Sequence, residues 1–308
     1  MASIEHARLR ALLPAVELRS RMLAAIRARF LACGFIEAET PVRLRTPALE
    51  LHIDAEPSGD HFLRTSPELH MKRLIAAGCG PVFQIGPCFR SGERGALHNP
   101  EFSMLEWYRP RADYRAVLAD AREFLAAVTR SVAGKSWVEW RGHRVDLDGE
   151  WIMLSVRDAF LAHAGWDPIA AYDAERFGWD YAEKIEPALA SAPAPVVLFD
   201  YPAAEAALAR LSPSDSRAAE RWELYVGGLE LANAFSELTD AAEQRARFET
   251  CAMARLALGR AAYPVDEPFL AALAAGMPDC AGAAFGLDRF LMLLAGAGSL
   301  DDVLPFRE

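Results

Sequence analysis

Residues 81–109 read PVFQIGPCFRSGERGALHNPEFSMLEWYR, and this stretch decides the fold. Its two ends, 81–90 and 101–109, are rich in apolar and aromatic residues, and the segment between them is polar and contains glycine. Two such runs joined by a short glycine-containing loop predict a pair of antiparallel strands. We therefore expect an antiparallel sheet at the centre of the protein.

The second of these strands carries charge on a face that we expect to be largely buried. Side chains alternate between the faces of a strand, so one face presents Phe102, Met104, Glu106 and Tyr108. A buried carboxylate costs several kcal/mol unless a cation or a hydrogen-bond donor meets it. Two explanations stay open for Glu106: an ion pair with Arg90 across the hairpin, or a place in a binding site.

The rest of the chain continues this mixture of helices and strands. Leu23, Ile26 and Phe30 recur at helical spacing and predict a helix over 16–33 that ends before Gly34. The other expected elements are an extended segment 35–42, a helix 114–132, a strand pair 137–147, a helical region 155–190, strands 195–202, 221–226 and 228–238, and a strand 281–286 that enters a helix 287–296. No repeat or linker-like composition interrupts this order, which predicts one α+β domain with an antiparallel sheet.

The composition bounds the class of protein. Hydrophobic residues make up 52% of the chain and charged residues 25%, as in ordinary globular proteins. No apolar run approaches the length of a membrane span, and the first residues lack the apolar core of a signal peptide. The five cysteines, at 33, 79, 88, 251 and 280, show no CxxC spacing. This favours reduced thiols and a cytoplasmic location over disulfides or a zinc site.

The charge distribution argues against an extended nucleic-acid surface. Residues 1–115 carry 16 Lys and Arg against 13 Asp and Glu, whereas the remainder carries 17 against 30. A protein that holds a long stretch of nucleic acid usually presents a basic face to the phosphates. The sequence also lacks the GxxxxGK[ST], GxGxxG and GxSxG motifs of common nucleotide sites and serine nucleophiles.

Residues 228–240, GLELANAFSELTD, place carboxylates on a strand without a basic residue among them. This pattern suggests a bound cation, either Mg²⁺ or the ammonium group of a ligand. Glu230 and Glu237 would point to opposite faces of a regular strand, so either a β-bulge or two separate roles is required.

Arg289 stands in the first turn of the last helix, close to Gly282 and Gly286. A cation at that end opposes the helix dipole, and glycines let a ligand approach the backbone. A bound anion such as a phosphate explains this arrangement better than stability does.

These segments resemble the signature motifs of a known family. CFRSGERGALHNPEFSMLEWYR (88–109) resembles motif 2 of the class II aminoacyl-tRNA synthetases, GAAFGLDRFLML (282–293) resembles motif 3, and GFIEAETPV (34–42) resembles the end of motif 1. TSPELHMKRL (65–74) and GLELANAFSELTD are similar to the lysyl branch. GPVFQIG and MPDCAGAAFGLDR are similar to the lysyl-tRNA synthetase paralogues that attach β-lysine to elongation factor P. The resemblance covers about residues 15–306.

The resemblance implies a class II catalytic fold, an antiparallel sheet flanked by helices. It implies a single domain over 1–308 with a helical and mixed insertion at about 112–195, and no anticodon-binding domain. It also implies a cytoplasmic homodimer formed through the motif 1 helix and Pro41. ATP and Mg²⁺ would be the cofactors, lysine or β-lysine the substrate, and a lysine side chain of elongation factor P the acceptor. Stable tRNA binding and membrane attachment are not expected.

The same resemblance assigns roles to residues. Arg90 would hold the α-phosphate, Glu230 would coordinate Mg²⁺, and Arg289 would stack on adenine opposite Phe102 and meet the γ-phosphate; Arg90, Glu230 and Arg289 would be catalytic. The remaining ATP contacts would be Glu93, His98, Asn99, Leu231 and Gly286. The amino-acid site would comprise Ser66, Glu68, Tyr108, Asn233, Glu237 and Ala284, with Tyr108 and Glu237 at the terminal ammonium.

Two positions separate this chain from the lysyl-tRNA synthetases. Gly92 stands where those enzymes have glutamate, and whether the following Glu93 takes over the adenine contact stays open. Ala284 stands where they have glycine and the paralogues have alanine, which favours the paralogues.

Two alternative functions also stay open. The chain could aminoacylate a tRNA or another small acceptor, or it could be a non-catalytic regulatory relative. Retention of Arg90, Glu230 and Arg289 argues against the second. The sequence does not distinguish between lysine isomers, because these differ only in the position of one amine. The charge distribution predicts that the acceptor docks near the arginine-richer first third.

Overall fold

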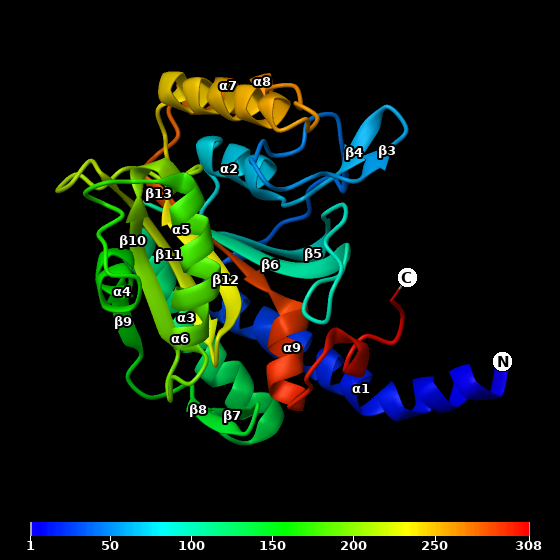
Figure 1. The fold of residues 1–308 in the computed structure, drawn as a ribbon. Coiled ribbons are helices and arrows are strands. Elements are labelled where there is room, and N and C mark those ends of the chain that lie inside the picture. Colours follow the sequence, from blue (N-terminus) through cyan, green and yellow to red (C-terminus); the bar gives the residue numbers. More distant parts are fainter. Residues whose placement is uncertain (1, 308) are drawn as a thin grey trace.

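The computed structural model describes residues 2–307 and is built on an eight-stranded sheet (Figure 1). The strand order is β1-β5-β6-β13-β12-β11-β10-β9, in which the neighbours from β5 to β10 are antiparallel. The strands are β1 Ile36–Glu37, β5 Val82–Phe89, β6 Glu101–Pro110, β9 Ile152–Ser155, β10 Val196–Pro202, β11 Ala218–Val226, β12 Leu229–Ser236 and β13 Cys280–Gly286. The expected α+β class with an antiparallel sheet flanked by helices is confirmed, and only the edge strands β1 and β9 pair in parallel.

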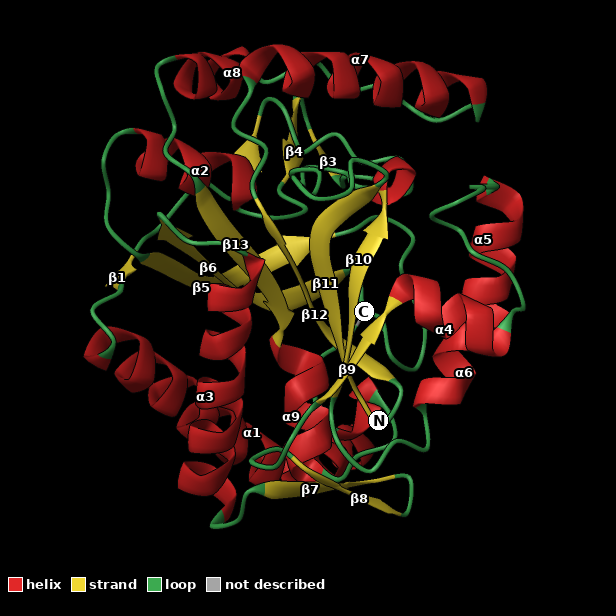
Figure 2. Ribbon diagram, turned by 90° about the vertical axis from the view of Figure 1, so that its left-hand side faces the viewer, coloured by secondary structure: helices red, strands yellow, loops and turns green. Residues whose placement is uncertain are grey.

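One face of the sheet is covered by three helices, α1 Ala2–Ala32, α3 Tyr114–Ala133 and α9 Leu287–Ala295 (Figure 2). Phe30 of α1 stacks on Phe83 of β5 and meets Trp107 of β6 edge-on, within the largest apolar cluster. Burial of such aromatic side chains supplies much of the driving force for folding. The opposite face is therefore left to carry the polar residues.

Helix α3 begins and ends at signals that the sequence contains. The carboxylate of Asp113 accepts hydrogen bonds from the backbone N–H groups of Arg115 and Ala116, and Gly134 ends the helix with φ 68°. Asp113 thus satisfies backbone N–H groups of the first turn that have no partner within the helix. Gly134 adopts the left-handed backbone conformation that glycine tolerates.

The other face is covered at one end by α2 Glu68–Ala76, α7 Ala241–Ala257 and α8 Glu267–Ala274 (Figure 1). Met71 of α2 and Phe269 of α8 join Val82 and Tyr108 of the sheet in a second apolar cluster. A small sheet in the order β2-β4-β3 lies beside them, formed by β2 Arg43–Leu44, β3 Pro57–Ser58 and β4 His61–Leu63.

The segment after α3 adds a hairpin and several short helices. The hairpin lies at the end of the molecule opposite α7 and α8 (Figure 2). The elements are β7 Trp137–Trp140, β8 His143–Asp146, α4 Val156–His163, α5 Ala174–Asp180, the π-helix η1 Tyr181–Ile185 and α6 Glu186–Leu189. Short 3₁₀ turns, η2 Ala203–Glu205 and η3 Leu300–Asp302, complete the described elements. None of the helices in this described part of the chain is long and apolar enough to cross a membrane.

Two expected boundaries at the N-terminal end differ from the structure. The first helix begins at Ala2, about four turns before the expected start at 16, and runs through Pro14. Its early residues are mostly Ala, Leu, Arg and Glu, which favour helix strongly enough to extend it past the proline. The extended segment 35–42 forms a ladder only at Ile36–Glu37.

Candidate active site

The polar face of the sheet carries a row of residues across four neighbouring strands. Glu106 of β6 pairs with Ala284 of β13, Ala284 pairs with Asn233 of β12, and Asn233 pairs with Glu223 of β11. Directly opposed side chains on one face of a sheet lie about 5 Å apart. The sheet therefore brings Asn233 and Ala284, which the sequence assigned to the amino-acid site, into one row with Glu106 and Glu223.

A β-bulge brings Glu230 onto this face. Leu224 of β11 pairs with Ala232, but the next residue, Tyr225, pairs with Glu230, so Leu231 is the extra residue. The extra residue reverses the alternation, and Glu230 and Asn233 share a face. In a regular strand Glu230 and Glu237 would point to opposite faces. The bulge removes this difficulty, and it is one of the two explanations that the sequence left open. The side chain of Leu231 packs into the apolar core instead.

The carboxylate of Glu106 is buried and is held by two hydroxyl groups. Ser66 Oγ donates to Glu106 Oε2 at 2.7 Å, and the Tyr108 hydroxyl donates to Oε1 at 2.5 Å. Burial, reinforced by the charge of Glu68, raises the pKa of Glu106 to about 7. The ion pair with Arg90 that was considered for Glu106 is not formed.

Lys72 is the main residue of the site that sequence reasoning missed. Its ammonium group is buried, lies 2.5 Å from Glu68 Oε1 and also contacts Glu237 Oε2. Burial by itself would lower the pKa of Lys72, but Glu237 and Glu68 together raise it. The expectation that the carboxylate at 237 has no cationic partner was therefore wrong. Lys72 stands four residues after Glu68 on the same helix, a spacing typical of ion pairs.

Gly282 allows Tyr108 and Glu237 to lie next to each other. A Cβ atom at 282 would stand 2.2 Å from Tyr108 Cε1 and 2.8 Å from Glu237 Oε1. Both distances are shorter than van der Waals contact, so only glycine fits here. Tyr108 and Glu237, which were predicted to share one end of the amino-acid site, do lie together.

The part of this face that was predicted to bind ATP carries two arginines, Arg90 and Arg289. The guanidinium carbon of Arg90 lies 5.1 Å from the centroid of the Phe102 ring, a cation–π arrangement. Arg90 Nε is buried and has no hydrogen-bond partner among the described residues. Arg90 Nη1 stands 3.9 Å from Glu93 Oε1, beyond a hydrogen bond. Arg90 is thus fixed by stacking and keeps donors for an anionic ligand.

Arg289 extends from α9 toward β12 and the loop after β5. Its Nη1 donates to the carbonyl of Glu230 at 2.8 Å and to Glu230 Oε2 at 3.3 Å, and its Nη2 donates to His98 Nε2 at 2.6 Å. Burial and the charge of Arg289 lower the pKa of His98. The expectation that Glu230 has no cationic partner was also wrong. Asn99, in contrast, bonds to the Glu101 carbonyl and to Arg307 rather than to these residues.

A third group of residues, next to Asn233, was not predicted. Arg221 donates to Glu223 Oε1 at 2.6 Å and to Asn233 Oδ1 at 3.1 Å. The hydroxyls of Tyr181 and Tyr225 donate to Glu223 Oε2 at 2.8 and 2.7 Å. Burial alone would raise the pKa of Glu223, but Arg221 and the tyrosine hydroxyls lower it. The alternation in RWELYV (221–226) could have revealed these residues, since it places 221, 223 and 225 on one face.

Glu223 and Glu230 fit one kind of metal site. Burial, and then Glu223, raises the pKa of Glu230, as expected for two carboxylates that lie close together. No group of three or more metal-binding side chains occurs in the range 2–307. Mg²⁺ is commonly held by one or two carboxylates together with substrate phosphates, which this pair permits.

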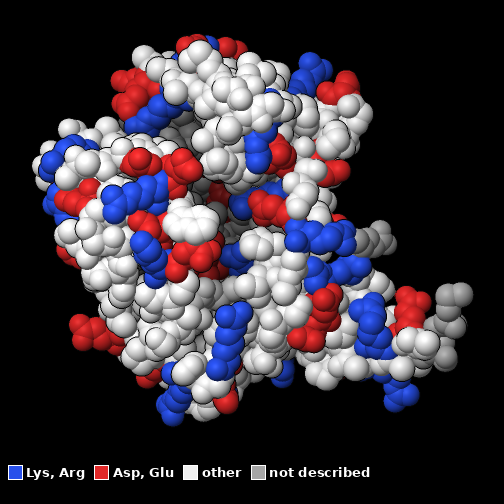
Figure 3. All heavy atoms as spheres, viewed as in Figure 1, with Lys and Arg blue, Asp and Glu red and all other residues white. Residues whose placement is uncertain are grey.

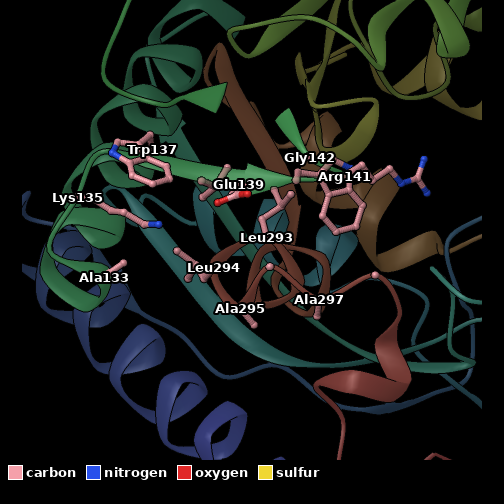
Figure 4. Close-up of a pocket in the computed structure, with 14 residues that line it drawn as sticks. Ala133, Lys135, Trp137, Glu139, Arg141, Gly142, Leu293, Leu294, Ala295 and Ala297 are labelled. Atoms are coloured by element: carbon pink, nitrogen blue, oxygen red, sulfur yellow. The ribbon is translucent and has the colours of Figure 1, made fainter. Parts of the chain in front are cut away.

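The surface is hollowed between the part that carries α7 and α8 and the body below, and charged side chains of both signs line its rim (Figure 3). A separate pocket lies between the β7–β8 hairpin and the last turn of α9, lined by Lys135, Trp137, Glu139, Leu293 and Leu294 among others (Figure 4). Within the described chain, none of the residues predicted for the site lines that pocket.

Comparison with known proteins agrees with this geometry. Residues 4–308 match the family described as tRNA synthetases class II (D, K and N). The chain is 37% identical to the elongation factor P–(R)-β-lysine ligase of Proteus mirabilis over 322 residues, which cover 94% of this chain and 93% of the relative. It is 38% identical to the ligases of the same name from Salmonella typhi and Klebsiella pneumoniae, with the same coverage.

Proposed function

We propose that this chain activates lysine or β-lysine with ATP and transfers it to a lysine side chain of elongation factor P. The proposal starts from the family: the chain belongs to the class II tRNA synthetases (D, K and N) and is an amino-acid ligase of that type. One observation carries the proposal. A cluster of three carboxylates, those of Glu68, Glu106 and Glu237, contains one internal cation, Lys72, and adjoins a face that carries Arg90.

The charges of the amino-acid part and of the ATP part of the site suit the amino acid and ATP, respectively. Two of the three carboxylates share Lys72, so the amino-acid half keeps an excess of negative charge that favours a substrate with two ammonium groups. Arg90 and Arg289 supply fixed positive charge for phosphate oxygens. Glu230, assisted by Glu223, would hold Mg²⁺, which would supply further neutralisation of phosphate charge.

The proposed reaction has two steps. The substrate carboxylate attacks the α-phosphorus of ATP, the bond to the β-phosphate oxygen breaks, and pyrophosphate leaves. The ε-amine of the acceptor lysine then attacks the acyl carbon of the adenylate, AMP leaves, and the amine loses a proton. Arg90 stabilises charge that develops on the α-phosphoryl oxygens, and the carboxylates of the cluster position the substrate.

Further parts of the proposal concern the whole enzyme. We propose a single catalytic domain over 1–308 with an insertion at about 112–195, acting in the cytoplasm, where the five free cysteines stay reduced. We also propose a homodimer through α1, because Leu13, Val16 and Leu31 on that helix are 51%, 40% and 54% exposed.

The test measures each step separately. We expect ATP–pyrophosphate exchange that depends on lysine or β-lysine, and transfer of the labelled amino acid to elongation factor P but not to tRNA. Arg90→Ala should lower exchange at least a hundredfold, whereas Arg130→Ala, which removes an exposed ion pair with Asp148, should leave it unchanged. Labelling of tRNA alone would support the aminoacylating alternative, and no exchange with any amino acid would support the non-catalytic one.

A further inference from the structure

The helical segment 174–189, formed by α5, η1 and α6, contains a change of helix type at Tyr181. There η1 begins as a π-helical turn between two α-helical pieces. Such turns redirect the side chains that follow and occur often at functional sites. Asp180, the residue before the turn, is buried; it accepts a hydrogen bond from Trp166 Nε1 at 2.8 Å and pairs with Lys184 Nζ at 2.5 Å. The start of the turn is thus fixed.

The end of this segment packs against the turn between β11 and β12. A Cβ atom at Gly228 would stand 2.8 Å from Ala190 Cα, so this turn lies directly against the residue that follows α6. The two strands carry Glu223 and Glu230. Tyr225, on the same face of β11 as Glu223, pairs with Glu230, so the two carboxylates are diagonal neighbours across the strands. The segment 174–189 therefore lies beside the carboxylates proposed to hold Mg²⁺.

The hydroxyl of Tyr181 lies among the hydrogen bonds that surround Glu223. It donates to Glu223 Oε2 at 2.8 Å and lies 2.8 Å from the Tyr201 hydroxyl and 2.7 Å from the Tyr225 hydroxyl. Tyr201 and Tyr225 belong to the strands β10 and β11, whereas Tyr181 comes from outside the sheet. Its ring packs against Phe177, with the ring centroids 5.6 Å apart. The ring therefore keeps a packing partner even without the hydroxyl.

These hydrogen bonds fix how Glu223 can meet a cation. Oε2 accepts from both Tyr181 and Tyr225, which occupies its two lone pairs. Oε1 accepts from Arg221 at 2.6 Å, which leaves its second lone pair for a cation among the described contacts. Metal-binding carboxylates are commonly oriented by hydrogen bonds of this kind. Loss of one such bond typically lowers metal affinity by about 10- to 100-fold.

We infer that Tyr181 is a positioning residue for the metal site. Its hydroxyl holds the Glu223 carboxylate in the orientation in which Glu223 can share a Mg²⁺ ion with Glu230, and Tyr181 itself touches neither the ion nor ATP. The inference rests on the proposed function and deepens it, because it gives the inserted segment 174–189 a part in metal binding.

The test removes only the Tyr181 hydroxyl. Tyr181→Phe keeps the ring and its packing on Phe177. In calorimetric titrations with the ATP analogue AMP-PNP, we expect affinity in Mg²⁺ to fall about tenfold, whereas affinity in EDTA stays within about twofold of the wild type. In ATP–pyrophosphate exchange, the Mg²⁺ concentration that gives half the maximal rate should rise about tenfold. The rate at saturating Mg²⁺ should change by no more than about twofold, because the hydroxyl does not contact the reacting atoms.

Tyr263→Phe is the matched control. Its hydroxyl, like that of Tyr181, makes a hydrogen bond of 2.8 Å, here from the backbone N–H of Ala55, and Tyr263 lies in the second apolar cluster. Both substitutions should lower the melting temperature, but Tyr263→Phe should leave the Mg²⁺ requirement and both AMP-PNP affinities as in the wild type.

A third variant separates failure of the inference from failure of the proposed function. Glu230→Gln removes a proposed ligand of the ion and should raise the Mg²⁺ requirement at least tenfold. If it does so but Tyr181→Phe does not, the inference is overturned and the metal site stands. Equal loss of AMP-PNP affinity with and without Mg²⁺ in Tyr181→Phe would also overturn the inference. If Glu230→Gln leaves the Mg²⁺ requirement unchanged, the proposed metal site fails and the inference with it.

Discussion

Lys72 shows how much of the site depends on a single side chain. Its side chain is 1% exposed, and its ammonium group neutralises Glu68 and Glu237 together. Removal of one partner from a buried ion pair leaves an uncompensated charge, which typically costs about 3–5 kcal/mol. We expect Lys72→Met to lower the free energy of unfolding by about that amount in urea titrations.

The matched control adds a second substitution. Lys72→Met with Glu237→Gln removes the carboxylate as well as the ammonium, so part of the lost stability should return. A Lys72→Met protein as stable as the wild type would show that Glu68 and Glu237 are neutral without the lysine.

Glu106 predicts a pH dependence of stability. Its pKa rises from 4.5 to about 7 on folding, so between these values the folded state holds a proton that the unfolded state releases. The contribution of Glu106 to the free energy of unfolding is therefore full below pH 4.5 and is lost as the pH rises to about 7. In Glu106→Gln the free energy of unfolding should fall less steeply over that window. Glu101→Gln, exposed at the start of β6, is the control, and equal slopes in all three proteins would contradict the assignment.

At the scale of elements, the packing around β13 predicts that alanine substitution at its two glycines, Gly282 and Gly286, affects stability very differently. Gly282→Ala would drive a methyl group into the Tyr108 ring, whereas the nearest atom to a Cβ at Gly286 is 3.8 Å away. Overpacking of this kind costs about 1–3 kcal/mol, so we expect Gly282→Ala to lower the melting temperature clearly and Gly286→Ala to change it little. Similar melting temperatures for the two variants would show that Tyr108 can move aside.

Elements also show what the sequence could and could not predict. The hairpin β5–β6 and helix α3 were predicted closely because alternation, caps and glycines are local signals. The bulge at Leu231 was only one of two options, since GLELANAFSEL contains nothing that fixes which residue is extra. The pairing of Lys72 with Glu237 joins residues 165 positions apart, and only the assembled fold brings them together.

At the scale of the whole molecule, the exposed apolar residues of α1 predict self-association. Leu13→Asp together with Val16→Asp should convert a dimer into a monomer in sedimentation equilibrium, because both side chains are largely exposed in the single chain. Ile4→Asp, at the far end of the helix and 75% exposed, is the control. A wild-type protein that stays monomeric at all concentrations would contradict the proposed dimer.

The contact of α1 with α9 has a mechanical consequence. Arg19 of α1 donates to Ser103 Oγ at 2.5 Å and pairs with Asp288, whose other oxygen accepts from the Ser103 N–H at 2.8 Å. The residue after Asp288 is Arg289, and the residue before Ser103 is Phe102. Arg19 thus connects α1 to the directly bonded neighbours of Phe102 and Arg289. If subunits associate through α1, as proposed, any shift of that helix on association would be transmitted to both residues. Subunit assembly and nucleotide affinity should then rise and fall together.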